Sequence, residues 1–279
     1  MPLDPTAVGW ESPPRETSWR PEDCLLYALG VGAGPADLVY VTENSIGVEH
    51  RALPTIPVVL GQFDDEVWQA MGTFSWAMMV HGGQEVVLHR PVPTEGRILT
   101  THRLAAMWDK GKAGVVEVES NAVDAGSDAA MFTLRTSLFI RGEGGWDGDR
   151  GPTAANPIPD RGPDHEIRDH IQPNQALIYR LCGDRNPLHS DPAFARKAGF
   201  EQPILHGLCT YGVTGRALLN ALCDDQPARF GGMSGRFASP VLPGDGLVVR
   251  VWEIDDGAAF QTALADGNVV FDAGRFTFS

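Results

Sequence analysis

The sequence predicts an α+β protein of two similar halves, in which each half has an antiparallel sheet wrapped around one long helix. Two observations lead to this prediction. In each part of the 279-residue chain, a short and then a longer helical segment are followed by strands whose residues alternate or are β-branched. Three short sequence motifs also recur in the same order: YALGVG matches YRLCGD, PVVLG matches PILHG, and RPV matches SPV. This self-similarity indicates a degenerate internal duplication.

The first half is placed at residues 1–141. Its helical segments have apolar residues at helical spacing, and its strands are short runs of alternating or β-branched residues. The predicted helices are 21–29 and 65–80, the second being the long one, and the predicted strands are 85–89, 98–107, 114–121 and 131–140.

Residues 142–164 interrupt the pattern. The segment is rich in Gly, Pro and Asp and lacks apolar periodicity, which indicates a linker. The second half, 165–279, then repeats the order of the first. Its predicted helices are 174–181 and the long 208–222, and its predicted strands are 235–238, 247–254, 259–264 and 269–278.

Charge and hydropathy exclude several classes of protein. Lys and Arg number 22 against 36 Asp and Glu, and the net charge of −14 argues against nucleic acid or an anionic membrane as a partner. A small phosphate-bearing metabolite stays compatible with this charge. No apolar run approaches the ~20 residues of a membrane span, and the N-terminus lacks the apolar core of a signal peptide.

The cysteines and the last residues of the sequence indicate the cellular compartment. Four cysteines are scattered without a C-x-x-C pair, which argues against disulfides and against a zinc site. The last residues, Thr277 to Ser279, do not form a peroxisomal address. We therefore expect a reduced, cytoplasmic protein that contains no metal.

The polar residues of the second half gather in the stretch GDRNPLHSDP. Asp184 and His189 lie five residues apart, and Pro187 between them enforces an extended or turned path that can direct both side chains into one pocket. In the first half, Gly32 and Asp37 stand at the matching positions. This asymmetry favours one active site per chain, although a backbone-capping aspartate and a surface histidine are the alternative.

Two neighbouring residues have less specific interpretations. Gly207 opens the long helix of the second half, where its amide has no intrahelical partner and lies at the positive end of the helix dipole. Such a donor suits a developing oxyanion, but a glycine used only for close packing fits the sequence equally well. We interpret His206 as structural, and Asp191 as the N-cap of a short helix at 193–198.

The run YRLCGDRNPLHSDPAFARKAGFEQPILHGLCTYG resembles the MaoC-type, or hydratase 2, family of (R)-specific enoyl-CoA hydratases. In the first half, YALGVGAG, PTIPVVLGQ, HGGQEVVLHRPVPTEGRI and WDKGKAGVVEVES are similar to the N-terminal half of the two-domain hydratase 2. The resemblance covers nearly the whole chain outside the linker. It implies a double hot-dog fold, CoA-thioester substrates and a place in fatty-acid β-oxidation, and we expect a homodimer.

The resemblance also implies roles for particular residues. The positions that match the family's catalytic loop and oxyanion donor are Asp184, Asn186, His189 and Gly207. The positions that match substrate or CoA contacts are His81, Gly82, Lys110 and Phe237. Without the resemblance, His81 and Gly82 are part of a turn, and Lys110 is a solvated lysine of a hairpin.

The implied reaction is the reversible syn addition of water to a trans-2-enoyl-CoA, which gives a (3R)-3-hydroxyacyl-CoA without a cofactor. His189 is expected to activate the water, Asp184 to protonate C2, and Asn186 to hold the water, while the roles of acid and base stay exchangeable within the pair. The two halves are expected to pair edge to edge, with the site at their interface. An apolar cluster of the first half could line a long-chain or steroid acyl group, although core packing is the simpler interpretation; it comprises Trp68, Met71, Phe74, Trp76, Met78 and Met79.

Two other functions fit a chain of this kind. A hot-dog acyl-CoA thioesterase would direct water at the carbonyl carbon in place of C3 and release free CoA. A non-catalytic acyl-CoA-binding subunit would need a partner chain for activity. The pairing of Asp184 with His189 in one loop, together with Gly207, favours the hydratase over both.

Overall fold

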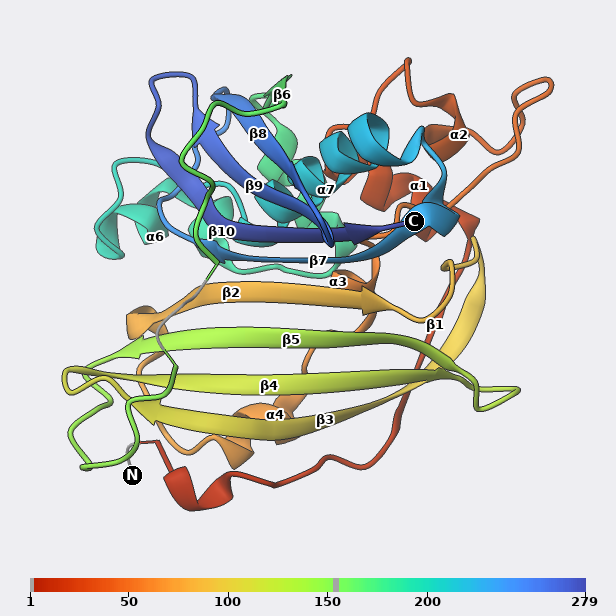
Figure 1. Cartoon of the computed structure of the whole chain (residues 1–279). Coiled ribbons are helices and arrows are strands. Elements are labelled where there is room, and N and C mark those ends of the chain that lie inside the picture. Colours follow the sequence, from red (N-terminus) through yellow and green to blue (C-terminus); the bar gives the residue numbers. More distant parts are fainter. Residues whose placement is uncertain (1–2, 153–155) are drawn as a thin grey trace.

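The computed structural model describes residues 3–152 and 156–279, and in this part of the chain ten strands form one continuous antiparallel sheet (Figure 1). The strand order is β1-β3-β4-β5-β2-β7-β10-β9-β8-β6, so each half supplies five adjacent strands. The first half contributes β1 (Arg15–Trp19), β2 (Met79–Leu88), β3 (Gly96–Asp109), β4 (Ala113–Asp124) and β5 (Ala130–Arg141). The second contributes β6 (His165–His170), β7 (Phe230–Phe237), β8 (Gly246–Ile254), β9 (Gly257–Leu264) and β10 (Val269–Phe278).

The two halves meet where β2 pairs with β7. The ladder runs from Gly83 opposite Arg236 to Val87 opposite Gly232. Two of these glycines permit the close approach, because a Cβ on Gly232 would lie 2.8 Å from the carbonyl oxygen of Val86, and one on Gly83 would lie 3.1 Å from that of Gly235. The predicted edge-to-edge pairing of the halves is therefore present in the structure.

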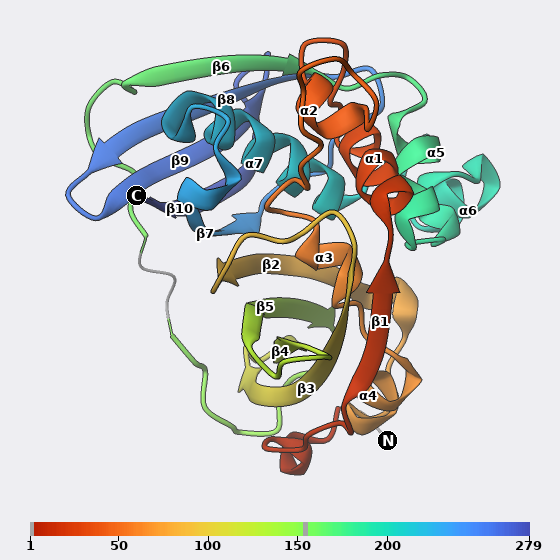
Figure 2. The same cartoon turned by 90° about the vertical axis from the view of Figure 1, so that its right-hand side faces the viewer.

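The second half contains the long helix that its sequence predicts. Helix α7 (Gly207–Cys223) is buried over most of its length and lies inside the curved strands of its half (Figure 2). Its apolar residues join a core that also includes residues of the first half. The other helical segments of this half are α5 (Gln175–Tyr179), η3 (Arg180–Cys182), η4 (Pro187–His189), α6 (Pro192–Lys197) and η5 (Pro227–Arg229).

The long helix predicted at 65–80 is wrong. Helix α4 (Asp65–Ala70) stops early, since Gly72 takes a φ of +106° that ends the helical path. After a short 3-10 turn, β2 begins at Met79, which pairs with Ile140 of β5. The first half therefore has only short helical segments in its described residues: η1 (Pro5–Ala7), α1 (Pro21–Gly30), α2 (Leu38–Val41), α3 (Pro57–Leu60), α4 and η2 (Trp76–Met78).

Helices of the two halves also pack directly on one another. Gln175 of α5 donates two hydrogen bonds to the carbonyls at the end of α1, at 2.8 Å from Leu29 and 2.6 Å from Gly30. Arg216 of α7 forms ion pairs with Asp37 of the first half and with Asp169 of β6. These contacts fix the helices of one half against those of the other.

The described linker residues, 142–152 and 156–164, lie along the outer surface between the strand end at Arg141 and the strand start at His165 (Figure 1). Of these, residues 142–152 are attached to the β3–β4 turn, where the amide of Asp109 donates to the carbonyl of Asp149, and the amide of Gly145 donates to the carboxylate of Asp109 at 2.9 Å. In the residues that the structure describes, none of the helices is long and apolar enough to cross a bilayer.

Separating the halves should expose the paired edges of β2 and β7. We expect residues 2–141 and 164–279, expressed separately, to aggregate or to pair with copies of themselves, because each would present an open strand edge beside an apolar face. Co-expression should give a one-to-one complex, measured by size-exclusion chromatography with light scattering. Two stable, separate monomers would contradict the account of the interface.

Candidate active site

The loop after η3 places Asp184 against the first half. Gly183 takes a φ of +134°, and a Cβ there would lie 2.7 Å from the side-chain oxygen of Gln62. Glycine is therefore required both for the backbone turn and for the contact with the first half. Asp184 follows directly, and one of its carboxylate oxygens accepts a hydrogen bond from the amide of Asn186 at 3.0 Å. Among the residues that the structure describes, its second carboxylate oxygen has no hydrogen-bond donor.

Asn186 caps the short turn that carries the histidine. Its side-chain oxygen accepts from the amide of Leu188 at 3.0 Å, and Pro187 occupies the first position of η4. The Asn186 side chain is exposed. Its oxygen serves the turn and its amide nitrogen is a donor, so a contact between Asn186 and the reacting water stays a prediction.

His189 is buried and its tautomer is set by one hydrogen bond. Its Nδ1 lies 2.9 Å from the carbonyl oxygen of Ile204, so Nδ1 carries the proton and Nε2 is left with a free lone pair. Burial holds the pKa of His189 below its ordinary 6.5, while Ile204 and Asp184 act in the opposite direction. The result is a neutral imidazole that can accept a proton at Nε2.

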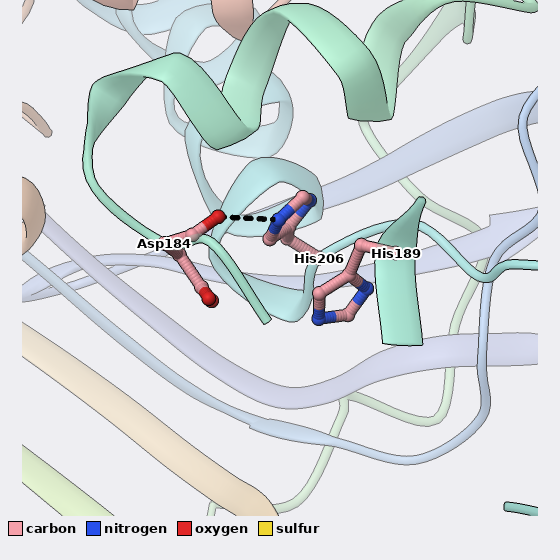
Figure 3. Close-up of side chains that lie close together, drawn as sticks. All are labelled: Asp184, His189 and His206. Carbon is pink, nitrogen blue, oxygen red and sulfur yellow. Dashed lines mark hydrogen bonds between the residues drawn. The ribbon is translucent and has the colours of Figure 1, made fainter. Parts of the chain in front are cut away.

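His206 lies beside both members of this pair (Figure 3). Its ring stacks on that of His189 with centroids 3.7 Å apart and planes 27° apart, and its Nε2 donates to the main-chain oxygen of Asp184 at 3.3 Å. Burial and the neighbouring His189 lower the pKa of His206 to about 3, so the ring is neutral. Ligand-type atoms of the three residues lie within 4.8 Å of one another.

Asp184, His189 and His206 have the kinds of side-chain atoms that bind metal ions. One ring nitrogen of each histidine, however, is already hydrogen-bonded to a main-chain carbonyl. A carboxylate with a free oxygen beside a neutral imidazole is the arrangement that general acid–base catalysis needs. The arrangement therefore fits the predicted role of Asp184 and His189 in proton transfer, which stays a prediction.

Gly207 begins α7 beside this group. As the first residue of a 17-residue helix, its amide has no carbonyl one turn earlier to bind, and it lies at the positive end of the dipole. A Cβ at this position would lie 3.3 Å from the ring of Phe237. The position thus combines a helix-start amide with close packing, and the role of Gly207 as an oxyanion donor stays a prediction.

The first half reaches the site through His81. The rings of His81 and Phe237 meet edge to face with centroids 5.0 Å apart, just beyond the end of the β2–β7 ladder at Gly83. Nε2 of His81 lies 3.0 Å from the carbonyl of Gly83, across an irregularity in β2, and burial lowers its pKa to about 4. Contacts thus run from His81 through Phe237 to Gly207.

A cleft of about 590 Å³ opens beside the residues that follow His81 in β2. Gly82 and Gly83 form part of its wall, and the side chains of Lys110, Arg150 and Arg236 line it. None of these three cations forms an ion pair with a carboxylate in the residues that the structure describes. Arg135, paired with Glu85, and Glu117 also line the cleft, so its cations outnumber its carboxylates on a chain whose net charge is −14.

The structure thus separates the predicted residues into two groups and one separate residue. The first group lies around the start of α7 and comprises Asp184, His189, Gly207, His81 and Phe237. Gly82 and Lys110 instead line the cleft, and Asn186 is exposed beside the turn.

No functional role is predicted from the sequence for three residues of this region. His206 is interpreted as structural, although the motif PILHG has His206 where PVVLG has Leu60, the same kind of asymmetry that pointed to Asp184. Arg150 and Arg236 went unnoticed because one lies in the linker and the other in a glycine-rich strand, where neither pattern nor spacing marks them.

The apolar cluster of the first half is divided by the structure. Met71 is fully buried in a second core, whereas Trp76 is 58% exposed and packs edge to face on Trp68, with ring centroids 4.8 Å apart. Phe74 also contacts Trp76. The cluster is therefore partly core and partly an aromatic surface, and its role toward an acyl chain stays a prediction.

Comparisons with known proteins agree over the whole chain. The MaoC like domain matches residues 154–273, and the MFE-2 hydratase 2 N-terminal domain matches residues 18–142. The 3-hydroxyacyl-thioester dehydratase Y of Mycobacterium tuberculosis is 42% identical over 100% of this chain and 99% of its own, and enoyl-CoA hydratase ChsH3 of the same organism is 41% identical over 91% and 90%. The crystal structure of a MaoC-like dehydratase from Phytophthora capsici superposes with a TM-score of 0.90 at 33% identity, covering 100% of this chain and 98% of the other.

The lowered pKa values of His81, His189 and His206 should be measurable in solution. Because their folded-state pKa values lie below 6.5, the stability they confer is present above pH 6.5 and is lost as the pH falls toward the folded-state values. Each such histidine adds a slope of up to about 1.4 kcal/mol per pH unit. NMR titration of the imidazole resonances should give a pKa below 6.5 for His189. A value at or above 6.5, with an unfolding free energy that is flat below this pH, would contradict the burial argument.

Proposed function

Because the chain belongs to the MaoC-like dehydratase family and carries the hydratase 2 N-terminal domain, we propose that it is an (R)-specific enoyl-CoA hydratase, which acts in reverse as a 3-hydroxyacyl-CoA dehydratase. It is a hydro-lyase with a double hot-dog fold. The observation that carries the proposal is the neutral His189, with its free Nε2, beside the Asp184 carboxylate and close to the start of α7.

The reaction needs one base, one acid and one oxyanion donor. His189 Nε2 takes a proton from water while the water oxygen bonds to C3, and the electrons of the C2–C3 bond move toward the thioester carbonyl. The Gly207 amide stabilises the enolate-like oxygen, a contribution of about 2.7–4 kcal/mol for one donor. The proton taken up by His189 passes to the Asp184 carboxylate, which delivers it to C2, so both side chains end in the state in which they began.

The geometry also accounts for syn addition. Asp184 and His189 come from one loop and lie close to one another, so both would face the same side of the reacting carbons and deliver the water oxygen and the proton to one face. Exchanging the roles of acid and base between Asp184 and His189 leaves the proton count unchanged. All the transferred groups come from water and these side chains, so the proposal needs no metal or cofactor.

The CoA portion is proposed to pass from the site to the cleft. The ladder between β2 and β7 ends at Gly83, and the thioester can cross the sheet beside the rings of His81 and Phe237. The phosphates would then meet Lys110 and Arg236. This path lets an acidic chain bind an anionic ligand through a local group of cations.

We also propose that the acyl group of the substrate is bulky. The first half has no helix comparable to α7 in its described residues, and its exposed aromatic surface around Trp76 offers apolar contacts. Long-chain and steroid side-chain acyl groups both fit this description. Assembly as a homodimer and residence in the cytoplasm stay predictions from the sequence.

The test of the function is incubation of the purified chain with crotonyl-CoA and with a longer trans-2-enoyl-CoA. Loss of the conjugated absorbance, with a product of (3R) configuration and no free thiol, is expected. Release of CoA thiol would identify a thioesterase. No reaction with either substrate would favour a binding subunit that needs a partner.

Asp184→Asn and His189→Gln should each lower kcat by roughly 10²–10⁴-fold while the melting temperature changes little, because each removes a proton-transfer group. Asp191→Asn is the matched control. Asp191 caps α6 through its side-chain oxygen at 2.7 Å from the amide of Ala193, and asparagine caps equally well. Near-normal turnover in either site variant would remove that residue from the mechanism.

Lys110→Ala should raise KM about fivefold at low salt, equivalent to about 1 kcal/mol, with a smaller effect on kcat. The wild-type KM should itself rise with ionic strength. Lys112→Ala is the control, since Lys112 lies on the same turn but does not line the cleft. Equal effects of the two substitutions, or a KM independent of salt, would exclude a specific phosphate contact.

A further inference from the structure

His206 connects three parts of the active site. It is the residue before Gly207, at the N-cap of α7. Its Nε2 donates to the main-chain oxygen of Asp184 at 3.3 Å, and its ring stacks on His189 at 3.7 Å (Figure 3). Only 1% of the residue is exposed. The side chain thus contacts the acid's backbone and the base's ring while its own backbone leads into the oxyanion donor.

The two ring nitrogens of His206 are not available to a substrate. Nε2 is committed to the Asp184 carbonyl, and Nδ1 is buried without a hydrogen-bond partner among the described residues. The ring also packs at 4.9 Å from the ring of Tyr179. His206 therefore does not exchange protons with the reacting atoms, and any effect on the reaction must act through its neighbours.

We propose that His206 is a positioning residue for the proposed hydratase reaction, which holds the Asp184 backbone with its Nε2–H and covers one face of the His189 ring. The hydrogen bond sets where the Asp184 carboxylate lies relative to the Gly207 amide. The stacked ring keeps water from one face of His189 and fixes the direction of its Nε2. This inference rests on the proposed function and adds to it a residue that the reaction scheme does not use.

The charges around the pair are consistent with this role. The titratable groups near His189 and His206 are Asp184 of the loop, Tyr179 of α5 and Arg180 of η3. His81 of β2 lies near Asp184 and interacts with it. Burial keeps His206 neutral at working pH, so it does not oppose a proton on His189. A neutral aromatic side chain with an N–H donor can therefore both bind the Asp184 carbonyl and cover the His189 ring.

Two substitutions separate the two contacts. His206→Gln retains an N–H donor for the Asp184 carbonyl but removes the stacked ring. Because water then reaches His189, its pKa should rise toward 6.5, and the acid limb of kcat/KM should move to higher pH with a roughly tenfold loss of kcat. His206→Phe retains the aromatic cover but removes the donor. Here kcat should fall roughly 100-fold with little change in KM and no shift of the acid limb.

His102→Gln is the matched control. His102 is also 1% exposed and has a ring nitrogen without a partner, but its hydrogen bond goes to Ser120 of β4, away from the catalytic loop. The rate, the acid limb and the NMR-derived pKa of His189 should all match the wild type in this variant.

The result that overturns the inference is a folded His206→Gln variant with kcat within twofold of wild type and an unshifted His189 pKa. If His206→Phe does not fold, the glutamine variant decides alone. The NMR titration needs no turnover, so it tests the contact even in a chain without hydratase activity. Wild-type inactivity on enoyl-CoA would instead refute the proposed function.

Discussion

The pairing of β2 with β7 is the interaction on which the rest of the structure depends. It joins two five-stranded halves into one sheet, and it is short: the ladder begins at Gly83 opposite Arg236 and ends at Val87 opposite Gly232. Where the backbone pairing stops, side chains continue the contact, since His81 packs on Phe237. Phe237 packs against the start of α7, and the neighbouring Arg236 lines the cationic cleft.

The duplication explains why one chain has one such site. The second half keeps Asp184 and His189 and the long helix whose first residue is Gly207, whereas the first half has Gly32 and Asp37 at the matching positions and only short helices. Asp37 has acquired a different role, because it forms an ion pair with Arg216 of α7 across the interface. The first copy therefore contacts the second through packing and charge, while the second carries the groups that we propose to react.

The sequence predicted those features that depend on local pattern. The loop from Asp184 to His189, α7 and most strands were predictable because turn residues, helical periodicity and alternation act over a few neighbours. The long helix predicted at 65–80 was wrong, since α4 ends at Ala70 and the residues from Met79 onward pair with β5, a contact far away in sequence. The edge strands β1 and β6 were missed because short, charged, half-exposed runs resemble loops. The cationic cleft combines strand, turn and linker residues, which no local pattern joins.

The central claim is that one thioester spans the junction, with its reacting carbons at Asp184 and His189 and its phosphates in the cleft. A crystal structure of the Asp184→Asn variant with bound 3-hydroxybutyryl-CoA tests this most directly. The account predicts the thioester oxygen within hydrogen-bond distance of the Gly207 amide, the C3 hydroxyl facing His189 Nε2, and phosphates beside Lys110 and Arg236. A thioester oxygen directed away from Gly207, or phosphates bound outside the cleft, would contradict it.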